Sequence, residues 1–196
     1  MADKENGDEF KLVILNLPPL MVAGALIAVV LTAAVFDVRY RRIPNWLSVS
    51  GAALGLGLNA IVGRGLPGVV FSLKGMLLSF SIYFVLYALH AMGAGDVKLM
   101  AAVGSLVGWQ DWLGIFLISA ILGGILALIV VAWHGRVRRT LGNVGFILSQ
   151  MARLRPAYLA REELDVRSPQ AVSLPHGAVI AVATLFFLSI TAHFMG

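Results

Sequence analysis

Six apolar runs, separated by polar breaks, account for most of the 196-residue chain. They cover residues 12–36, 46–62, 67–90, 97–107, 112–133 and 178–195. A helix that crosses a membrane needs about 20 mostly apolar residues, so runs of this kind predict membrane-spanning helices. We therefore expect an all-α, polytopic membrane protein with about six transmembrane helices, and we treat residues 1–196 as a single membrane-embedded domain.

The fourth run, 97–107, is the short one. At 1.5 Å per residue, a helix of this length covers only about 16 Å of a hydrocarbon core about 30 Å thick. Either its helix continues through residues 108–111, or Asp96 begins the helix well inside the membrane. Trp109 and Trp112 flank the 108–111 turn, and we expect both to anchor the chain at the membrane interface.

Two polar segments lie outside the apolar runs. Residues 1–11 mix acids with lysines and predict a polar tail, since a secretory signal would begin with a basic segment. Residues 134–174 form a long connection that carries seven arginines. Apolar residues at helical spacing between positions 144 and 164 suggest an amphipathic helix on the membrane surface.

Basic residues are distributed unevenly between the connections. One alternate set holds Arg39, Arg41, Arg42, Lys98 and the arginines of 134–174, and the other holds Lys4, Lys11 and Arg64. Cytoplasmic loops carry the excess of basic residues, so we place the first set, including 134–174, in the cytoplasm and both termini outside it. Anionic lipid headgroups then account for the net charge of +5. We expect no nucleic-acid partner.

Only two acids lie at the ends of apolar runs on the predicted cytoplasmic side. Of the ten acids, four are in the tail, three are in the 134–174 connection and Asp111 is in the 108–111 turn, which leaves Asp37 and Asp96. Two carboxylates in an apolar setting can share one proton. The ionised one can then activate a water, and the protonated one can polarise a carbonyl. This is the chemistry of an aspartyl protease. The chain has no cysteine, and its four histidines lack zinc-site spacing, so we expect no metal site.

Asp96 is framed by Gly93 and Gly95 in the segment GAGDVKL, residues 93–99. Glycine permits unusual backbone angles and close approach of another chain, so we expect both glycines to place the carboxylate. An acid inside a membrane span is costly and is a functional hypothesis by default. The simpler interpretation is that Asp96 is the N-cap of a membrane helix, where the helix dipole favours a negative charge.

These segments resemble the type IV prepilin peptidase family of GxGD-type intramembrane aspartyl proteases. The resemblance rests on Asp37 with the following RRIPNW (41–46), on GAGDVKL with AAVG behind it (101–104), and on LPHGA (174–178). In the last motif the family more usually has an aromatic residue in place of the histidine. The match covers residues 30–195.

The resemblance implies an intramembrane aspartic endopeptidase with Asp37 and Asp96 as its catalytic pair. It would remove the short leader of type IV prepilins or pseudopilins at the cytoplasmic face of the bacterial inner membrane, with the prepilin and the lipid bilayer as partners and no cofactor. Large members carry a domain with paired Cys-x-x-Cys motifs between the first two helices and also N-methylate the product. Here the connection 37–45 is short and the chain lacks cysteine, so it resembles the compact members of Flp or tight-adherence pili. This departure argues against methylation by S-adenosylmethionine.

Three further residues are expected to shape the site. Lys98 lies about 200° around a helix from Asp96, so the two side chains do not face each other. Lys98 either reaches the headgroups or binds substrate and tunes the acid pair. Pro44 shapes the loop before the second span, and Asn45 is expected to cap that span.

Two other functions remain open from the residues alone. A small proton-coupled transporter could use Asp37, Asp96 and Lys98 as a relay, although both acids lie at one end of the spans and no inverted repeat is visible. A eukaryotic-type GxGD protease, such as signal peptide peptidase, would carry Tyr-Asp and Pro-Ala-Leu motifs. In this chain Phe36 precedes the first acid and the third motif reads Pro-His-Gly.

Overall fold

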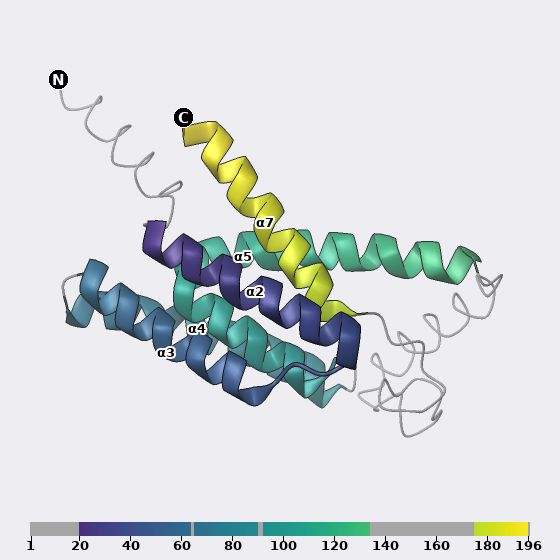
Figure 1. The fold of residues 1–196 in the computed structure, drawn as a ribbon, viewed down its shortest axis with the longest axis horizontal. Helices are drawn as coiled ribbons and strands as arrows, with labels where there is room; N and C mark the ends of the chain where they lie inside the picture. The colour runs from purple at the N-terminus through teal and green to yellow at the C-terminus, as the bar shows by residue number, and fades with distance from the viewer. Residues whose placement is uncertain (1–19, 64, 90–91, 134–174, 196) are drawn as a thin grey trace, which may run out of the picture.

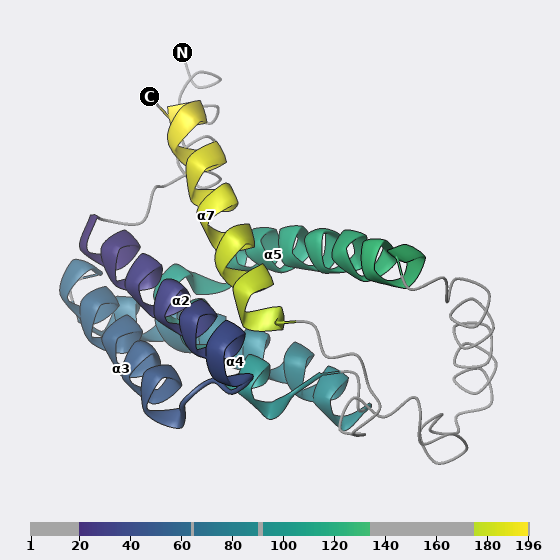
Figure 2. The same cartoon turned by 45° about the vertical axis from the view of Figure 1, so that its right-hand side comes forward.

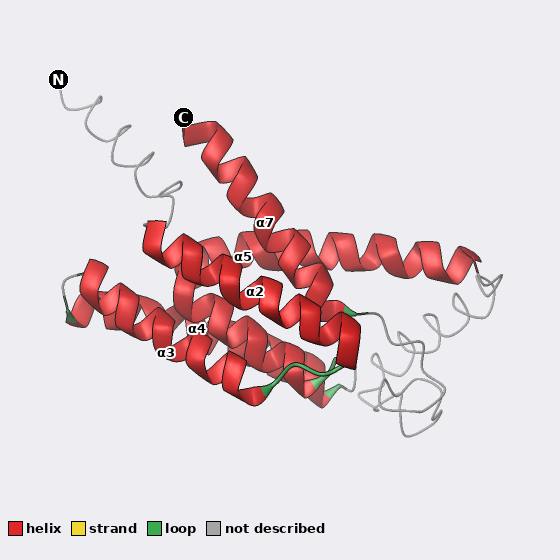
Figure 3. Ribbon diagram, in the orientation of Figure 1, coloured by secondary structure: helices red, strands yellow, loops and turns green. Residues whose placement is uncertain are grey.

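The computed structural model describes residues 20–63, 65–89, 92–133 and 175–195, and every regular element within them is a helix (Figure 3). The helices are α2 (Leu20–Tyr40), α3 (Asn45–Val62), α4 (Leu66–Ala88), α5 (Ala94–Trp133) and α7 (His176–Met195) (Figure 1). All five are long and apolar enough to cross a membrane, which confirms the predicted all-α, polytopic class. The predicted tail 1–11 and the predicted connection 134–174 lie outside the described residues.

The predicted fourth and fifth spans form one element, the 40-residue helix α5. A straight helix of that length would extend about 60 Å, about twice the hydrocarbon core. Instead α5 folds at Gly108, and its second arm returns toward the end of the bundle where the first arm began (Figure 1). The expected six spans therefore correspond, in the described residues, to five helices of which one has two arms.

Gly108 is required at the bend for two separate reasons. Its φ of 76° and ψ of 179° lie in a region that is essentially restricted to glycine. A Cβ at this position would also collide with the ring of Phe71 on α4. The chain can therefore fold back at this point only because residue 108 is glycine.

The bend leaves carbonyl groups at the end of the first arm without their helical donors. Side chains of α3 and α4 replace those donors. Nδ2 of Asn59 donates to the carbonyls of Ser105 (2.9 Å) and Leu106 (3.0 Å), and Oγ of Ser72 donates to the carbonyl of Ser105 at 2.5 Å. Asn59 and Ser72 are buried, where an unpaired polar group costs about 1–3 kcal/mol. These two side chains therefore stabilise the fold-back from neighbouring helices.

The helices on either side of this polar contact approach closely. A Cβ built on Gly75 of α4 would clash with the carbonyl of Gly104 on α5, and one on Gly104 would clash with Gly75. Small residues allow such contacts between membrane helices. This close contact holds the first arm of α5, which carries Asp96, firmly against α4.

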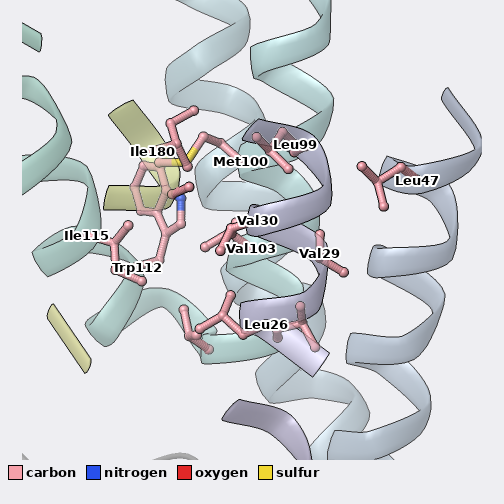
Figure 4. Packing of buried hydrophobic residues seen from close by; sticks show 14 of the residues in the cluster. Leu26, Val29, Val30, Leu47, Leu99, Met100, Val103, Trp112, Ile115 and Ile180 are labelled. Atoms are coloured by element: carbon pink, nitrogen blue, oxygen red, sulfur yellow. The ribbon is translucent and has the colours of Figure 1, made fainter. Parts of the chain in front are cut away.

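The apolar core lies between α2, both arms of α5 and α7. Figure 4 shows side chains from all of these elements converging, among them Leu26, Val30, Met100, Val103, Trp112, Ile115 and Ile180, each with at most 1% of its surface exposed. Helix α7 packs against α2 and the second arm of α5, and Figure 2 shows that arm extending away from α2, α3 and α4.

Trp112 is the clearest correction to the sequence-based expectations. It is fully buried, with its ring stacked on Phe116 at 5.3 Å and edge-on to Tyr83 at 6.2 Å. The prediction of an interface anchor is wrong for Trp112, because the second arm turns this residue inward against α4. Trp109, with 42% of its surface exposed, lies outside the core.

The helix ends divide into two groups. The C-terminal ends of α2 and α4 and the N-terminal ends of α3, α5 and α7 gather at one end of the bundle (Figure 1). The opposite end holds the start of α2, the turn between α3 and α4, and the bend of α5. Asp37 and Asp96 both belong to the first group, which we call the acidic end.

Candidate active site

Asp37 lies one turn before the end of α2, and it is 9% exposed. Its backbone carbonyl accepts a 2.9 Å hydrogen bond from the amide of Arg41. Arg41 has a φ of 53°, an uncommon conformation for a residue other than glycine. The chain therefore turns sharply after α2 and returns across the acidic end toward α3.

The carboxylate of Asp37 accepts a hydrogen bond from the N-terminus of another helix. The amide of Gly177, the second residue of α7, donates to Oδ2 at 2.7 Å across 140 residues of sequence. This bond is buried. Hydrogen bonds from an amide to an ionised carboxylate are shorter and stronger than neutral ones, and a helix N-terminus favours a negative charge. Asp37 is therefore bound at the start of α7.

Asp96 occupies the first turn of α5 and is partly buried. It is the third residue of the helix, so the N-cap interpretation is wrong in detail, because Gly93 precedes the first helical residue. Gly93 lies beside the Asp96 carboxylate, since a Cβ built on Gly93 would lie 3.3 Å from Oδ2 of Asp96. An acid at this position can bond back to the amide that precedes the helix, as in one half of a capping box. Gly93 therefore helps to orient Asp96.

The structure brings the two acids together. Asp37 and Asp96 come from different helices, yet they lie close enough to interact electrostatically. His176, the first residue of α7, interacts electrostatically with Asp37 as well. Its Nε2 atom is buried and has no hydrogen-bond partner among the described residues. Asp37 thus interacts with both Asp96 and His176 at the acidic end.

Ile43, in the loop between α2 and α3, lies beside Gly95, which precedes Asp96, and beside Gly177, which binds Asp37. A Cβ built on Gly95 would lie 3.3 Å from Cβ of Ile43, and one on Gly177 would lie 3.2 Å from its Cδ1. Gly95 therefore lies next to Ile43, as Gly177 does on the side of Asp37. Neither Ile43 nor Gly177 is expected from the sequence to contact an acid. The only signal in the sequence is their presence in the IPN and PHG motifs.

Lys98 and Asn45 form a contact that the sequence does not predict. The ammonium Nζ of Lys98 donates to Oδ1 of Asn45 at 2.8 Å. Pro44 is the residue at the N-cap of α3, where no side chain caps the helix. The predicted capping role of Asn45 is therefore wrong, because its side chain is turned toward α5 instead. The hydrogen bond directs the side chain of Lys98 toward α3.

No group of three or more histidine, cysteine, aspartate or glutamate side chains in the described part of the chain could hold a metal ion. The acidic end holds the carboxylates of Asp37 and Asp96, which interact electrostatically. One of them can hold a proton while the other is ionised, which is the arrangement needed to activate water and to polarise a carbonyl.

Comparisons with known proteins converge on one family. A sequence profile of the type IV leader peptidase family matches residues 24–128, which include Asp37 and Asp96. The prepilin leader peptidase/N-methyltransferase of Pectobacterium carotovorum is 33% identical over 130 residues, covering 62% of this chain and 45% of that protein.

Two further relatives carry the same description. The Legionella pneumophila protein is 35% identical over 126 residues, covering 62% of this chain and 44% of the relative. The Escherichia coli K12 protein is 34% identical over 134 residues, covering 64% and 58%. The chain thus spans about half the length of the curated relatives it matches. No solved structure matches the chain.

Proposed function

The chain belongs to the type IV leader peptidase family, and on that basis we propose that it is an aspartic endopeptidase that removes the leader of type IV prepilins or pseudopilins. The proposal rests on one observation: Asp37 and Asp96 interact electrostatically at one end of a bundle of apolar helices. Both acids lie within the region that matches the family.

We assign Asp37 and Asp96 as the catalytic pair. In the first step the ionised carboxylate removes a proton from a water, and the water oxygen adds to the peptide carbonyl. The protonated carboxyl stabilises the oxygen of that carbonyl as its charge develops. Collapse of the tetrahedral intermediate breaks the carbon–nitrogen bond, and the leaving amine takes a proton from the acid pair. The products are the leader with a new carboxylate and the pilin with a new N-terminus.

The remaining site residues would shape this reaction rather than perform it. Gly93 and Gly95 hold Asp96 at the helix start, Pro44 directs the loop that carries Ile43, and Lys98 joins α5 to Asn45. A peptide must be extended to expose its carbonyl. In the proposed complex an extended peptide would displace Ile43 from Gly95, where the absence of a side chain permits close approach.

The proposed location is the bacterial inner membrane, with the acidic end at the cytoplasmic face. Arg39, Arg41, Arg42 and Lys98 all belong to the acidic end, and the positive-inside rule supports a cytoplasmic position for it. Both termini would then be extracytoplasmic. The short 41–44 connection between α2 and α3 favours a compact, Flp-type peptidase without the methylation reaction.

The test uses the purified protein in lipid vesicles with a prepilin substrate, and mass spectrometry of the new N-terminus as the readout. We expect Asp37→Asn and Asp96→Asn each to abolish cleavage. Asp111→Asn is the matched control, since Asp111 belongs to the same helix as Asp96 but lies near the bend at the other end. It should keep wild-type activity.

Cleavage retained by either acid variant, at equal folded protein, would overturn the catalytic pair. Proton flux through the vesicles without cleavage of any prepilin would favour the transporter alternative. The family match argues against that alternative, and the relay it requires would have to include Lys98, whose ammonium is bonded to Asn45.

A further inference from the structure

We propose that the backbone amide of Gly177 is a positioning group for the reaction, which makes the start of α7 a third part of the site. It would bind Oδ2 of Asp37 and leave the other carboxylate oxygen, Oδ1, directed at the attacking water. This inference rests on the proposed function, because it assigns Asp37 a place in that chemistry.

The first step of the argument concerns the amides at the start of α7. The first amides of any helix lack partners within the helix. Those of Ala178 and Val179 bond to the carbonyl of Pro175, at 3.2 Å and 3.3 Å. The amide of Gly177 is directed elsewhere, to Oδ2 of Asp37 at 2.7 Å. It makes the shortest of these three bonds, and its acceptor is an acid from a distant helix.

The second step concerns the missing side chain at position 177. A Cβ built there would lie 3.1 Å from both Cβ and Oδ2 of Asp37, and 3.2 Å from Cδ1 of Ile43. Any side chain would therefore push the carboxylate or Ile43 aside. The absence of a side chain at Gly177 therefore lets its amide reach Oδ2 of Asp37 without displacing either neighbour.

The third step connects this geometry with rate. A reacting group displaced by about 1 Å can lose about 100-fold in rate. One amide fixes one oxygen of Asp37 in a buried setting, where a hydrogen bond to a charged acceptor is stronger than one between neutral groups. Loss of the amide should therefore lower the rate of the chemical step and leave substrate binding unchanged.

The experiment compares Gly177→Pro with Gly177→Ala in the full-length protein. Both variants add a Cβ, but only proline removes the amide hydrogen, and proline is tolerated in a first helical turn. Ala178→Pro is the matched control, because it removes the neighbouring amide, which bonds only to Pro175. We expect kcat of Gly177→Pro to fall about 10- to 100-fold below that of Gly177→Ala, with KM within about twofold. Ala178→Pro should lose clearly less kcat than Gly177→Pro.

Equal kcat for folded Gly177→Pro and Gly177→Ala would overturn the inference, as would an equal loss in Ala178→Pro. If Gly177→Pro does not fold, the amide can be replaced by an ester at position 177 through incorporation of glycolic acid, and the same loss of kcat is expected. Inactive Asp37→Asn together with an unaffected ester would reject the role of Gly177 alone. Active Asp37→Asn would reject the proposed function itself.

Discussion

The ammonium of Lys98 on α5 donates a 2.8 Å hydrogen bond to the side-chain carbonyl of Asn45 on α3. Lys98 lies two residues from Asp96, and Asn45 lies two residues from Ile43. The contact thus joins the helix that carries Asp96 to the start of α3, next to the loop that holds Ile43. It links segments 53 residues apart in the chain.

This contact should appear as coupling between two substitutions. Lys98→Ala and Asn45→Ala are each expected to lower thermal stability slightly, because the pair is exposed. The double variant should lose less than the sum of the single losses, by about 0.5–1.5 kcal/mol. Thermal unfolding of the three variants in detergent measures the coupling. Additive losses would show that the hydrogen bond contributes nothing to stability.

Substitution of the bend residue should be among the most damaging changes in the protein. Gly108→Ala forces a side chain into a backbone conformation reserved for glycine and against Phe71. We expect a loss of about 3 kcal/mol or more, or failure to fold. Gly124→Ala is the control, since nothing lies within 4 Å of a Cβ at Gly124 on the same helix. Equal melting temperatures for the two variants would contradict the fold-back.

The polar contact that supports the bend gives a second stability prediction. Asn59→Leu removes both hydrogen bonds to the carbonyls of Ser105 and Leu106 and leaves Leu106 without this donor in a buried site. We expect a loss of about 2–4 kcal/mol. Ser81→Ala is the control, because its exposed hydroxyl bonds only within its own helix, to Leu77. If Asn59→Leu were as stable as Ser81→Ala, the hydrogen bonds of Asn59 would not be needed to stabilise the bend.

Gly95 is predicted to act through either the substrate or Ile43, and a rescue experiment separates the two. A Cβ at Gly95 would lie 3.3 Å from Cβ of Ile43, so Gly95→Ala must displace that side chain by a few tenths of an ångström. We expect Gly95→Ala to lower turnover per folded molecule about 100-fold, because the substrate backbone needs the same space. Adding Ile43→Ala should not restore activity. Full rescue by Ile43→Ala would reduce Gly95 to a packing residue.

The predicted membrane topology can be tested at two residues outside the described ones, Ser149 and Arg64. A cysteine introduced at Ser149 should resist an impermeant thiol reagent added to intact cells, because the 134–174 connection is predicted to be cytoplasmic. A cysteine at Arg64 should react, since that turn is predicted to face outward. The native chain has no cysteine, so each label reports a single site. The reverse pattern would invert the topology and move the acidic end outside.

Much of the fold follows from hydrophobic length alone. The observed bounds of α3, Asn45–Val62, and of α4, Leu66–Ala88, agree closely with the apolar runs. The break at 108–111 predicts a turn between the fourth and fifth runs, but the sequence does not show that Gly108 bends one continuous helix, because that geometry depends on the packing around it. The prediction that Trp112 anchors the chain at the membrane interface fails for a related reason. An aromatic residue after a turn suits an interface or a core equally well, and only the direction of the second arm decides between them.

The candidate site, like the fold, is only partly predictable from the sequence. The pairing of Asp37 and Asp96 at one end follows from counting spans, because helices of alternating direction return to the same side. The contacts of Gly177 and Asn45 do not follow, because local rules cannot foresee a partner 140 or 53 residues away. Asparagine is a common N-cap residue. The side chain of Asn45 instead accepts a hydrogen bond from Lys98, which lies 53 residues away in the chain.

Gly177 is synthesised 140 residues after Asp37, so the hydrogen bond between them can form only late in synthesis. A ribosome that adds about 5–20 residues per second needs roughly 7–30 s to make the 140 residues between them. Until α7 enters the bilayer, the acid on α2 has no amide to orient it, although both aspartates are already present. If the amide of Gly177 positions Asp37 as proposed, the nascent chain would cleave its substrate more slowly before α7 is inserted than afterwards.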